Sequence, residues 1–386
     1  MDDMEFTRRL ILTKQGLYKK NQFGRGISGT LKAIKNIGYV QIDSISVVER
    51  AHHHVLWSRV PDYKTSYLNQ LQKEKKVFEY WSHAAAYIPI EDYRYCLPRM
   101  LKMREGSHWF SRDKKLMDEV LHRIKVDGPL MSKDFETTKT SGKMWDIKPV
   151  KRAIHELFQM GKLVVKDRVG FHKIYDLPER FIPNNIITSM PTIKEFTRYI
   201  ILTSINAQGI VNKNEICYLR KGIKKDIEIE IKYLLVEGII KELNFLGRNY
   251  LLMNDIEIKL PIRPNNLRVE IISPFDNSII QRDRLFSFFN FEYKTEIYLP
   301  KEKRTYGYFT LPILWGSRFV GRLNPKADRK NKVLLIDNLI LHNSLDTDEK
   351  FMNELLKRIK DFASFNSCIK VIFLQKEFNY LDIELI

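Results

Sequence analysis

Two polar residues separated by one apolar residue, Gln41 and Asp43, are the first candidates for chemistry in this sequence. The pattern around them predicts a strand, so both side chains should lie on one strand face, about 7 Å apart. A carboxylate there could stabilise a developing positive charge or orient and deprotonate a water molecule, and an amide could hold that water. Alternatively, Asp43 caps a following helix and Gln41 only faces solvent.

Three consecutive histidines, His52, His53 and His54, follow this motif. Adjacent residues project in different directions, unlike the i, i+4 pair of a helical metal site, and no carboxylate or thiol completes a ligand set with recognisable spacing. We therefore expect neither a metal nor a cofactor. Hydrogen bonds to phosphate, or the shaping of a pocket, are the roles that we predict for these side chains.

Aromatic and cationic residues interleave in the next part of the chain, with Trp57 and Tyr80-Trp81 among the rings and Arg59 and Arg94 among the cations. Rings beside phosphate-binding cations suit a protein that handles bent or unstacked nucleic acid. Core packing is the alternative explanation for many of the rings. A later basic run, residues 326–330, is either a phosphate contact or a solvated turn.

The charge balance favours a polyanionic partner. The 386 residues include 65 Lys and Arg against 47 Asp and Glu, which gives a net charge of +18, spread along the chain in short runs. This balance is typical of nucleic-acid-binding proteins, although a soluble protein with a high pI and no such partner is the alternative. The sequence has no phosphate-binding loop, dinucleotide fingerprint or nucleophile elbow, which disfavours NTP-driven and serine-hydrolase functions.

Composition predicts an ordered, soluble chain of two to four domains, because 44% of the residues are hydrophobic and only 17 are Gly and 14 Pro. Cys96, Cys217 and Cys368 are isolated, so we predict neither disulfides nor a cysteine-held zinc. The acidic N-terminus and the lack of any apolar run of about 18 residues predict a cytoplasmic protein with no membrane segment.

An internal repeat with an offset of 77 residues (Gly161 to Gly238) predicts the scaffold. In each copy, an amphipathic helical stripe ends at a glycine suited to a left-handed helix cap and is followed by a hairpin. The matching stripes are Val150, Ile154, Leu157 and Phe158 in the first copy and Ile227, Ile231, Leu234 and Leu235 in the second. Further helices upstream, at 116–126 and 194–206, complete two winged-helix units at about 112–178 and 190–254.

A fainter third copy lies at the N-terminus at an offset of 123 residues (Gly38 to Gly161), and it places Gln41 on the strand after its last helix. From residue 268 onward, short alternating runs predict strands, followed by a helix with Phe351, Leu355, Ile359 and Phe362 on one face and by a strand at 369–373. The predicted strands before that helix are 269–272, 293–298, 308–314, 319–323 and 333–340.

The predicted fold class is therefore α+β. It consists of tandem winged-helix modules, two clear and one degenerate N-terminal copy, followed by a small antiparallel β-barrel with a helix. The expected domains are 1–111, which contains the motif, then 112–189, 190–258 and 259–386.

The run from Gln41 to Arg59 resembles the signature of the AlkZ and YcaQ winged-helix DNA glycosylases. Four further stretches carry the resemblance, in order, over nearly the whole chain: Glu79-Tyr80-Trp81-Ser82-His83-Ala84-Ala85-Ala86-Tyr87, Ser273-Pro274-Phe275-Asp276-Asn277, Arg304-Thr305-Tyr306-Gly307-Tyr308 and residues 321–330. The resemblance implies a C-shaped scaffold of tandem winged helices with a C-terminal β-barrel. It also implies removal of N7-alkylated purines from DNA and unhooking of interstrand crosslinks.

The catalytic motif of that family is Gln, an apolar residue, then Gln or Asp. The resemblance therefore implies that Gln41 and Asp43 are catalytic, and the aspartate matches the YcaQ-like branch. The DNA-contacting residues that we predict are Arg50, His52, His53, Trp57, Arg59, Asp276, Asn277, Lys326 and Arg329.

An N7-alkylated guanine is cationic, so it leaves as a neutral base with little or no protonation, and one carboxylate can suffice. Asp43 would stabilise the oxocarbenium-like sugar and orient or deprotonate the water, which Gln41 would hold. No lysine nucleophile is needed, so we predict a monofunctional glycosylase with no Schiff base. Because a crosslink resists extrusion of its bases, the resemblance suggests that an open basic concavity reaches the lesion in place.

The expected partner is double-stranded DNA that carries alkylated bases, the process is base excision repair, and the protein is expected to be a monomer. Two other functions are open from the residues alone. One is a non-catalytic winged-helix DNA-binding regulator, since winged helices most often serve that role. The other is a metal-dependent nuclease that uses His52, His53 or His54.

Overall fold

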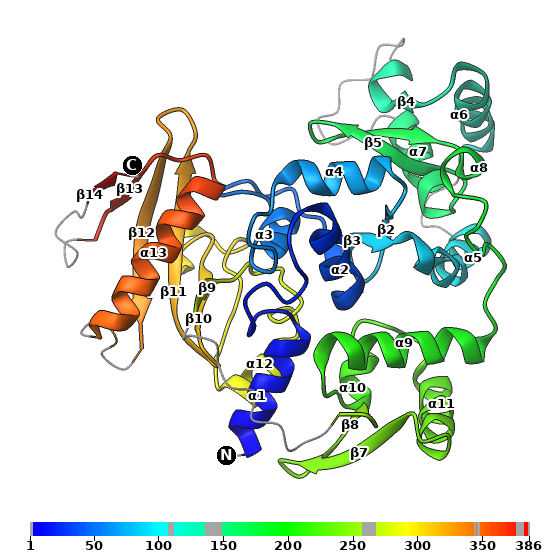
Figure 1. Ribbon diagram of the computed structural model, residues 1–386. Helices are drawn as coiled ribbons and strands as arrows, with labels where there is room; N and C mark the ends of the chain where they lie inside the picture. The colour runs from blue at the N-terminus through cyan, green and yellow to red at the C-terminus, as the bar shows by residue number, and fades with distance from the viewer. Residues whose placement is uncertain are drawn as a thin grey trace. The chain divides into compact units, whose positions relative to one another are not determined.

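The structure is a computed structural model that describes residues 3–106, 112–135, 149–256, 268–342, 345, 348–375 and 382–384. Its contacts group the chain into a large unit, residues 1–64 with 200–386, and a small unit, residues 65–199 (Figure 1). The fold is mixed α+β, as the sequence predicted. The four domain boundaries that we expected stay predictions.

The large unit begins with the elements that lead into the candidate motif: α1 (Asp3–Lys14), α2 (Gly26–Ile37), the two-residue strand β1 (Val40–Gln41) and α3 (Ala51–Trp57). Helix α2 buries Ala33, Ile34 and Ile37 on one face. It ends at Gly38, which has a φ of 79° and donates its backbone N–H to the Ile34 carbonyl. Only glycine adopts this left-handed backbone at low cost, so Gly38 fixes the direction in which the motif leaves the helix.

A six-stranded sheet forms the C-terminal part of the large unit, in the order β14-β13-β12-β11-β10-β9. The strands are β9 (Val269–Ile271), β10 (Leu311–Trp315), β11 (Arg318–Asp328), β12 (Val333–Leu341), β13 (Lys370–Phe373) and β14 (Asp382–Glu384). All neighbours are antiparallel except β12 and β13. The prediction of a wholly antiparallel sheet is therefore wrong at this pair, because α13 (Glu349–Phe365) carries the chain back before β13 begins.

Helix α13 confirms the predicted apolar stripe, since Phe351, Leu355, Ile359 and Phe362 are all fully buried. It lies along the sheet in Figure 1. The prediction of a strand at 293–298 is wrong: this segment is a loop between α12 (Arg282–Phe289) and the short 3-10 helix η3 (Lys301–Lys303). Buried and exposed residues alternate in this segment because its inward side chains anchor the loop. They do not alternate because the segment pairs with a neighbouring strand.

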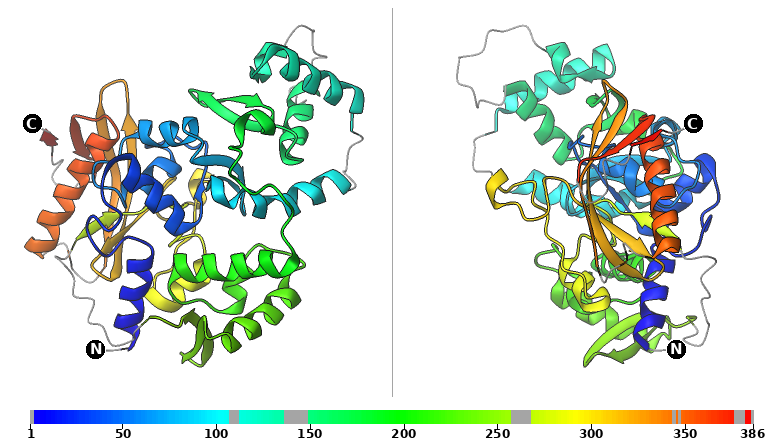
Figure 2. Two further views of the ribbon diagram at one scale, coloured as in Figure 1. Left: turned by 45° about the vertical axis from the view of Figure 1, so that its right-hand side comes forward. Right: turned by 90° about the vertical axis from the view of Figure 1, so that its left-hand side faces the viewer.

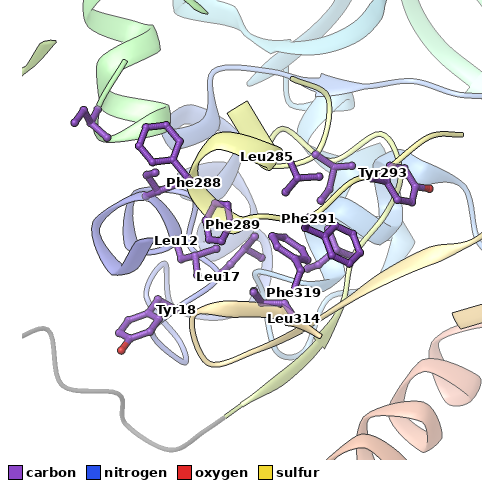
Figure 3. Close-up of a cluster of buried hydrophobic side chains, with 14 of the residues drawn as sticks. Leu12, Leu17, Tyr18, Leu285, Phe288, Phe289, Phe291, Tyr293, Leu314 and Phe319 are labelled. Atoms are coloured by element: carbon purple, nitrogen blue, oxygen red, sulfur yellow. The ribbon is translucent and has the colours of Figure 1, made fainter. Parts of the chain in front are cut away.

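One apolar cluster connects the first helix to the C-terminal half of the large unit (Figure 3). Leu12 of α1 packs in this cluster with Leu285 and Phe288 of α12, and with Leu314 and Phe319 from β10 and β11. Burial of side chains of this size stabilises the fold by about 1.5–3 kcal/mol each. Helix α1 is thereby anchored to α12 and to the sheet.

The small unit contains α4 (Thr65–Lys73), β2 (Val77–Trp81), β3 (Ala85–Pro89), η1 (Ile90–Cys96), α5 (Leu97–Glu105), α6 (Lys114–Asp127), β4 (Leu130–Met131), η2 (Ser132–Phe135), α7 (Pro149–Gln159), β5 (Val164–Val169), β6 (His172–Asp176) and α8 (Pro178–Phe181). Buried Glu79 on β2 accepts hydrogen bonds of 2.5 and 2.8 Å from the Arg168 guanidinium on β5. The stretch 79–87, which carries part of the family resemblance, is thus held by an internal ion pair.

The helix–hairpin order of the predicted repeat occurs in both copies. Helices α6 and α7 precede the β5–β6 hairpin, and the later copy comprises α9 (Ile193–Gln208), α10 (Lys213–Ile216), α11 (Lys224–Val236), β7 (Ile240–Phe245) and β8 (Arg248–Met253). Gly161 and Gly238 follow α7 and α11 with φ values of 66° and 67°. These values confirm the predicted left-handed helix ends.

Candidate active site

Gln41 and Asp43 lie where a strand gives way to an irregular segment. Strand β1 ends at Gln41, and residues 42–46 form neither helix nor strand. The prediction that both side chains share one strand face is therefore wrong for Asp43. The physical reason is local: the Asp43 carboxylate accepts the backbone N–H of Ile45, an Asx-type bond that competes with a strand ladder.

The Asp43 carboxylate is half-buried and anchored at one oxygen. Its Oδ1 accepts the Ile45 N–H at 2.7 Å. Burial raises the pKa of Asp43, and the bond from Ile45 partly opposes that rise. Within the described part of the chain, no cationic side chain forms a salt bridge with this carboxylate. The alternative of a helix cap is wrong, because the next helix, α3, begins only at Ala51.

A buried amide braces the chain just before the motif. The Asn277 Nδ2 group donates to the carbonyl oxygens of Ile37 and Tyr39, at 3.1 and 3.3 Å. These residues are the end of α2 and the approach to β1, and Val40 next to them is completely buried. Asn277 is only 4% exposed. This geometry does not support its predicted contact with DNA; Asn277 instead braces the backbone at Ile37 and Tyr39, just before Gln41.

The chain after the motif is held by the end of β11. Arg329 donates from Nη1 to the Ser46 carbonyl at 2.8 Å and from Nη2 to the Val48 carbonyl at 3.0 Å. Between these two bonds, the Ala327 backbone N–H donates to the Val47 carbonyl at 2.9 Å. Next along the chain, the Glu49 N–H donates to the side-chain oxygen of Asn366, at the end of α13, at 2.6 Å. The segment 46–49 is therefore fixed to the sheet and to α13.

Arg59 and Asp276 are brought together, but inside the protein. The two side chains form a bidentate ion pair with N–O distances of 2.6 and 2.9 Å, and neither is exposed. Further Arg59 bonds go to the carbonyls of Gln15 and Val55 and to the Gln15 side chain. A guanidinium enclosed in this way offers no surface to a phosphate, so the predicted DNA contacts of Arg59 and Asp276 are not supported in this structure.

All three histidines are buried in α3. His53 Nδ1 lies 2.7 Å from the Tyr63 hydroxyl, and His54 Nε2 lies 2.8 Å from the Ile271 carbonyl. Burial lowers the pKa of His53 to about 3 and that of His54 to about 4. His52 is 4% exposed, with its ring 4.3 Å from that of His53. The side chains of His52 and His53 therefore have little accessible surface for the predicted contacts with phosphate. A role in shaping the site fits their burial better.

The Trp57 ring is covered by the protein itself. The Arg358 guanidinium carbon lies 3.5 Å from the centre of the indole, and Phe365 stacks on it at 5.1 Å. Only 6% of the residue is exposed. Trp57 is thus part of the α3–α13 packing, and the predicted stacking on DNA is not supported by this arrangement.

Two of the predicted DNA contacts retain accessible side chains, in addition to the exposed Arg329. Lys326 is exposed on β11, three residues before Arg329. Arg50 is half-buried at the start of α3, where its carbonyl accepts the N–H groups of His53 and His54. Arg50 directly follows the held segment 46–49 in the chain, and Lys326 directly precedes Ala327, which bonds to that segment. Both therefore remain candidates for phosphate contacts.

Sequence reasoning missed the residues that position this segment from a distance. Gln15, Tyr63 and Asn366 supply the bonds to Arg59, His53 and Glu49. Asn366 is separated from Glu49 by 317 residues and Gln15 from Arg59 by 44, and nothing in the local sequence marks Tyr63 as the partner of His53. Only a three-dimensional structure or a comparison of many related sequences could identify them.

Among the residues that the structure describes, no group of three or more His, Cys, Asp or Glu side chains could hold a metal ion. Over the same residues, no helix has the length and apolar character needed to cross a membrane.

The fold has a counterpart among solved structures. The DNA glycosylase AlkZ of Streptomyces sahachiroi superimposes with a TM-score of 0.63 at 14% sequence identity, over 96% of this chain and 99% of that one. At this identity the likeness concerns the fold. It identifies the large and small units as parts of a fold that is used by a DNA glycosylase.

The sequence matches the family of AlkZ-like DNA glycosylases over residues 34–365. The match covers most of the chain and includes Gln41, Asp43, Asn277 and Arg329. The chain belongs to this family, and the resemblance on which the sequence analysis relied is confirmed.

Proposed function

We propose that this DNA glycosylase hydrolyses the N-glycosidic bond of cationic N7-alkylated purines in duplex DNA, including those in interstrand crosslinks. The observation that carries the proposal is the state of Asp43. Its carboxylate is half-buried, is held at one oxygen by Ile45, and has no salt-bridge partner in the described part of the chain. A half-buried anion that forms no salt bridge with the described residues is suited to a substrate that brings a positive charge.

The reaction has two positive species for that carboxylate to stabilise. The alkylated purine is cationic before the bond breaks, and the sugar becomes oxocarbenium-like as the base departs as a neutral molecule. Asp43 stabilises the sugar cation and takes the proton of the water that attacks C1′. The products are a free base and an abasic site, with no covalent bond to the protein.

Gln41 is proposed to hold the attacking water. It lies at the end of β1, half-buried and two residues from Asp43, with both a donor and an acceptor on its amide. The buried Val40 and the Asn277 bonds before it limit its movement. An amide that can hold a water molecule, two residues from a carboxylate that can activate it, suits hydrolysis. No lysine nucleophile takes part, so strand cleavage by a lyase step is not expected.

The scaffold is proposed to bind the DNA backbone without reading its sequence. A net charge of +18 favours a polyanion, and phosphate contacts by the exposed Lys326 and the half-buried Arg50 would be weakened by salt. We propose that the two helix–hairpin copies are winged-helix modules and that the N-terminal elements are a degenerate third copy. The C-terminal sheet would be the counterpart of the β-barrel that the resemblance implies.

The test is incubation of the protein, in EDTA, with duplexes that carry N7-methylguanine or a nitrogen-mustard crosslink, followed by scoring of heat-labile abasic sites. Release of base from either substrate, with no borohydride-trapped protein–DNA adduct, is the expected result. No base release from either duplex would contradict the proposal and favour a non-catalytic DNA-binding regulator. Strand cleavage of the same duplexes in a parallel incubation with Mg²⁺, lost in EDTA, would instead favour a metal-dependent nuclease.

A further inference from the structure

A series of hydrogen bonds within the large unit leads from α10 to the backbone that enters the candidate motif. At its start, Glu215 and Asn212 form a capping box: the Asn212 side chain accepts the Glu215 N–H at 3.0 Å, and Glu215 Oε2 accepts the Asn212 N–H at 3.1 Å. The same Oε2 accepts a bond of 2.6 Å from Arg284 Nη1 on α12. One carboxylate therefore holds both the first turn of α10 and an arginine of α12.

Arg284 also holds the end of α9. Its other terminal nitrogen, Nη2, donates to the backbone carbonyl of Gln208, the last residue of that helix, at 2.9 Å. The side chains of Arg284 and Glu215 are only 5% and 11% exposed. Helix α12, in yellow, lies beside the green α10 in both views of Figure 2. Because loss of either partner would leave a nearly buried charge, this ion pair fixes the three helix ends relative to one another.

The Gln208 side chain extends from α9 to the residue that braces the motif. Gln208 Nε2 donates to the Asn277 carbonyl at 3.3 Å. The Asn277 amide in turn donates to the carbonyls of Ile37 and Tyr39. Both amide NH₂ groups face backbone carbonyls, which only accept hydrogen bonds, so the orientation of each amide is determined. The backbone that leads into β1 is thus bonded, through two buried side chains, to the end of α9.

The turn that contains Asn277 is held from a second side as well. Asp276 pairs with Arg59, and its Oδ1 also accepts the backbone N–H and the hydroxyl of Ser278 at 2.9 and 2.7 Å. These bonds keep the turn in the fold even without the connection to Arg284. Removal of Arg284 is therefore expected to loosen Asn277 and the backbone that it braces, and not to detach the turn.

From these contacts we propose that Arg284 is a positioning residue for base release. Together with Glu215 it fixes the end of α9, and the amides of Gln208 and Asn277 thereby fix the backbone that carries Gln41. A misplacement of about 1 Å at a catalytic group can slow a reaction about a hundredfold. The inference rests on the proposed function, because base release is the reaction that is affected. It adds that the second helix–hairpin copy positions the motif through side chains that take no part in the chemistry.

Hydrogen exchange tests this connection without any substrate. We expect the backbone amides of residues 39–42 to exchange about tenfold faster in Arg284→Met and in Gln208→Met than in wild type, while the amides of α13 keep their wild-type rates. Lys213→Met is the matched control, because it removes another bond of 2.6 Å from α10, which leads to Glu228 on α11 and not to the motif. This control should leave the exchange of residues 39–42 unchanged.

Single-turnover base release from an N7-methylguanine duplex, with the enzyme in excess, tests the effect on the reaction. Arg284→Met and Gln208→Met should each be about tenfold slower than wild type, with DNA affinity within about twofold, and Lys213→Met should keep the wild-type rate. The double variant of Arg284 and Gln208 should be no slower than the slower single variant, because both residues act through Asn277. Independent defects would instead multiply their effects on the rate.

Wild-type exchange at residues 39–42 in Gln208→Met would overturn the proposal, and so would faster exchange that spreads equally to α13, since that marks a general loss of stability. Multiplied rate defects in the double variant would also overturn it. If Arg284→Met does not fold, Gln208→Met decides alone, because it removes only a neutral amide. Failure of wild type to release any base would contradict the proposed function alone, since the exchange comparison still decides whether Arg284 and Gln208 hold the motif.

Discussion

The Arg59 guanidinium and the Asp276 carboxylate meet in two parallel hydrogen bonds of 2.6 and 2.9 Å in the interior of the large unit. The pair ties the chain after α3 to the loop after β9. Burial alone would raise the pKa of Asp276, but the charge of Arg59 and the hydrogen bonds from Arg59 and Ser278 hold it below its ordinary value. Asp276 therefore remains ionised at physiological pH and keeps Arg59 in place.

Removal of either partner should destabilise the fold strongly. We expect Arg59→Ala and Asp276→Ala each to lower the free energy of unfolding by about 3–5 kcal/mol, because each leaves a buried charge without a partner. The double variant should lose less than the two single losses added together. Urea unfolding measures all three. An Arg59→Ala protein as stable as wild type, but with reduced affinity for DNA, would support the original prediction of a DNA contact.

Lys326 and Arg329 are only three residues apart, but we expect them to have different roles. Lys326 should bind DNA, whereas Arg329 should position the segment after the motif. Arg329 donates to two backbone carbonyls of the segment after the motif, whereas Lys326 is exposed on the same strand. We expect Arg329→Ala to slow single-turnover base release about tenfold by loosening residues 46–48, with the salt dependence of DNA binding unchanged. Lys326→Ala should leave the saturated rate unchanged and reduce the slope of log affinity against log salt by about one.

Equilibrium binding at several salt concentrations, together with single-turnover rates, distinguishes these two roles. A reduced salt slope in Arg329→Ala at an unchanged rate would mean that Arg329 contacts a phosphate, as the sequence analysis first predicted.

The buried histidines should make the fold sensitive to acid. Burial holds the pKa of His53 at about 3 and that of His54 at about 4, whereas in the unfolded chain a histidine takes up a proton near pH 6.5. Below pH 6.5 the unfolded state therefore binds protons that the folded state does not. The stability from neutral histidine is fully present above that pH and is lost as the pH falls toward the folded-state pKa values.

We expect the free energy of unfolding to fall from pH 7 to pH 5, and His53→Gln to reduce the slope by up to about 1.4 kcal/mol per pH unit. The test compares the slope of the unfolding free energy against pH and not the free energy itself. The reason is that the substitution also removes the bond to Tyr63 and so changes stability at every pH. His172→Gln, at an exposed position on β6, is the matched control and should leave the slope unchanged. An unaltered slope in His53→Gln would show that this histidine does not stay neutral in the fold.

The parts of the fold that could be predicted from the sequence are those with local periodicity. The stripe on α13 and the glycines after α7 and α11 follow from spacing alone, and the structure confirms them. The roles of charged residues near the motif could not be predicted in this way. Asp276 is separated from Arg59 by 217 residues, so no local pattern connects them. The sequence also does not show whether the partner of an arginine is a phosphate or a buried carboxylate.

The predicted strand position of Asp43 failed for a similar reason. Alternating polarity favours a strand, but a short aspartate side chain can bond to the backbone two residues later and end the ladder. The prediction of a strand at 293–298 failed because the buried side chains of this segment anchor a loop. The hydrogen bonds from residues 305–307 to Glu296 demonstrate this anchoring. Both corrections depend on bonds that no periodicity reveals.

The pH dependence of base release should report on Asp43. Burial raises the pKa of this carboxylate, and the ionised form is the one that stabilises the sugar cation. We therefore expect the single-turnover rate to fall as the pH is lowered through a midpoint above the ordinary range of an exposed aspartate. The rate should be constant at higher pH, because departure of an N7-alkylated purine needs no protonation. A rate that rises on acidification would mean that an acid protonates the base.

The measurement that tests the central claim most directly is the single-turnover rate of base release by Asp43→Asn from an N7-methylguanine duplex, with the enzyme in excess. Asparagine retains an oxygen for the Ile45 N–H, so the variant should fold and bind DNA as wild type does. We predict that the rate of Asp43→Asn is at most about one hundredth of the wild-type rate. Its affinity for DNA should stay within about twofold of the wild-type affinity. Equal rates for Asp43→Asn and wild type would contradict the proposed role of Asp43 in catalysis.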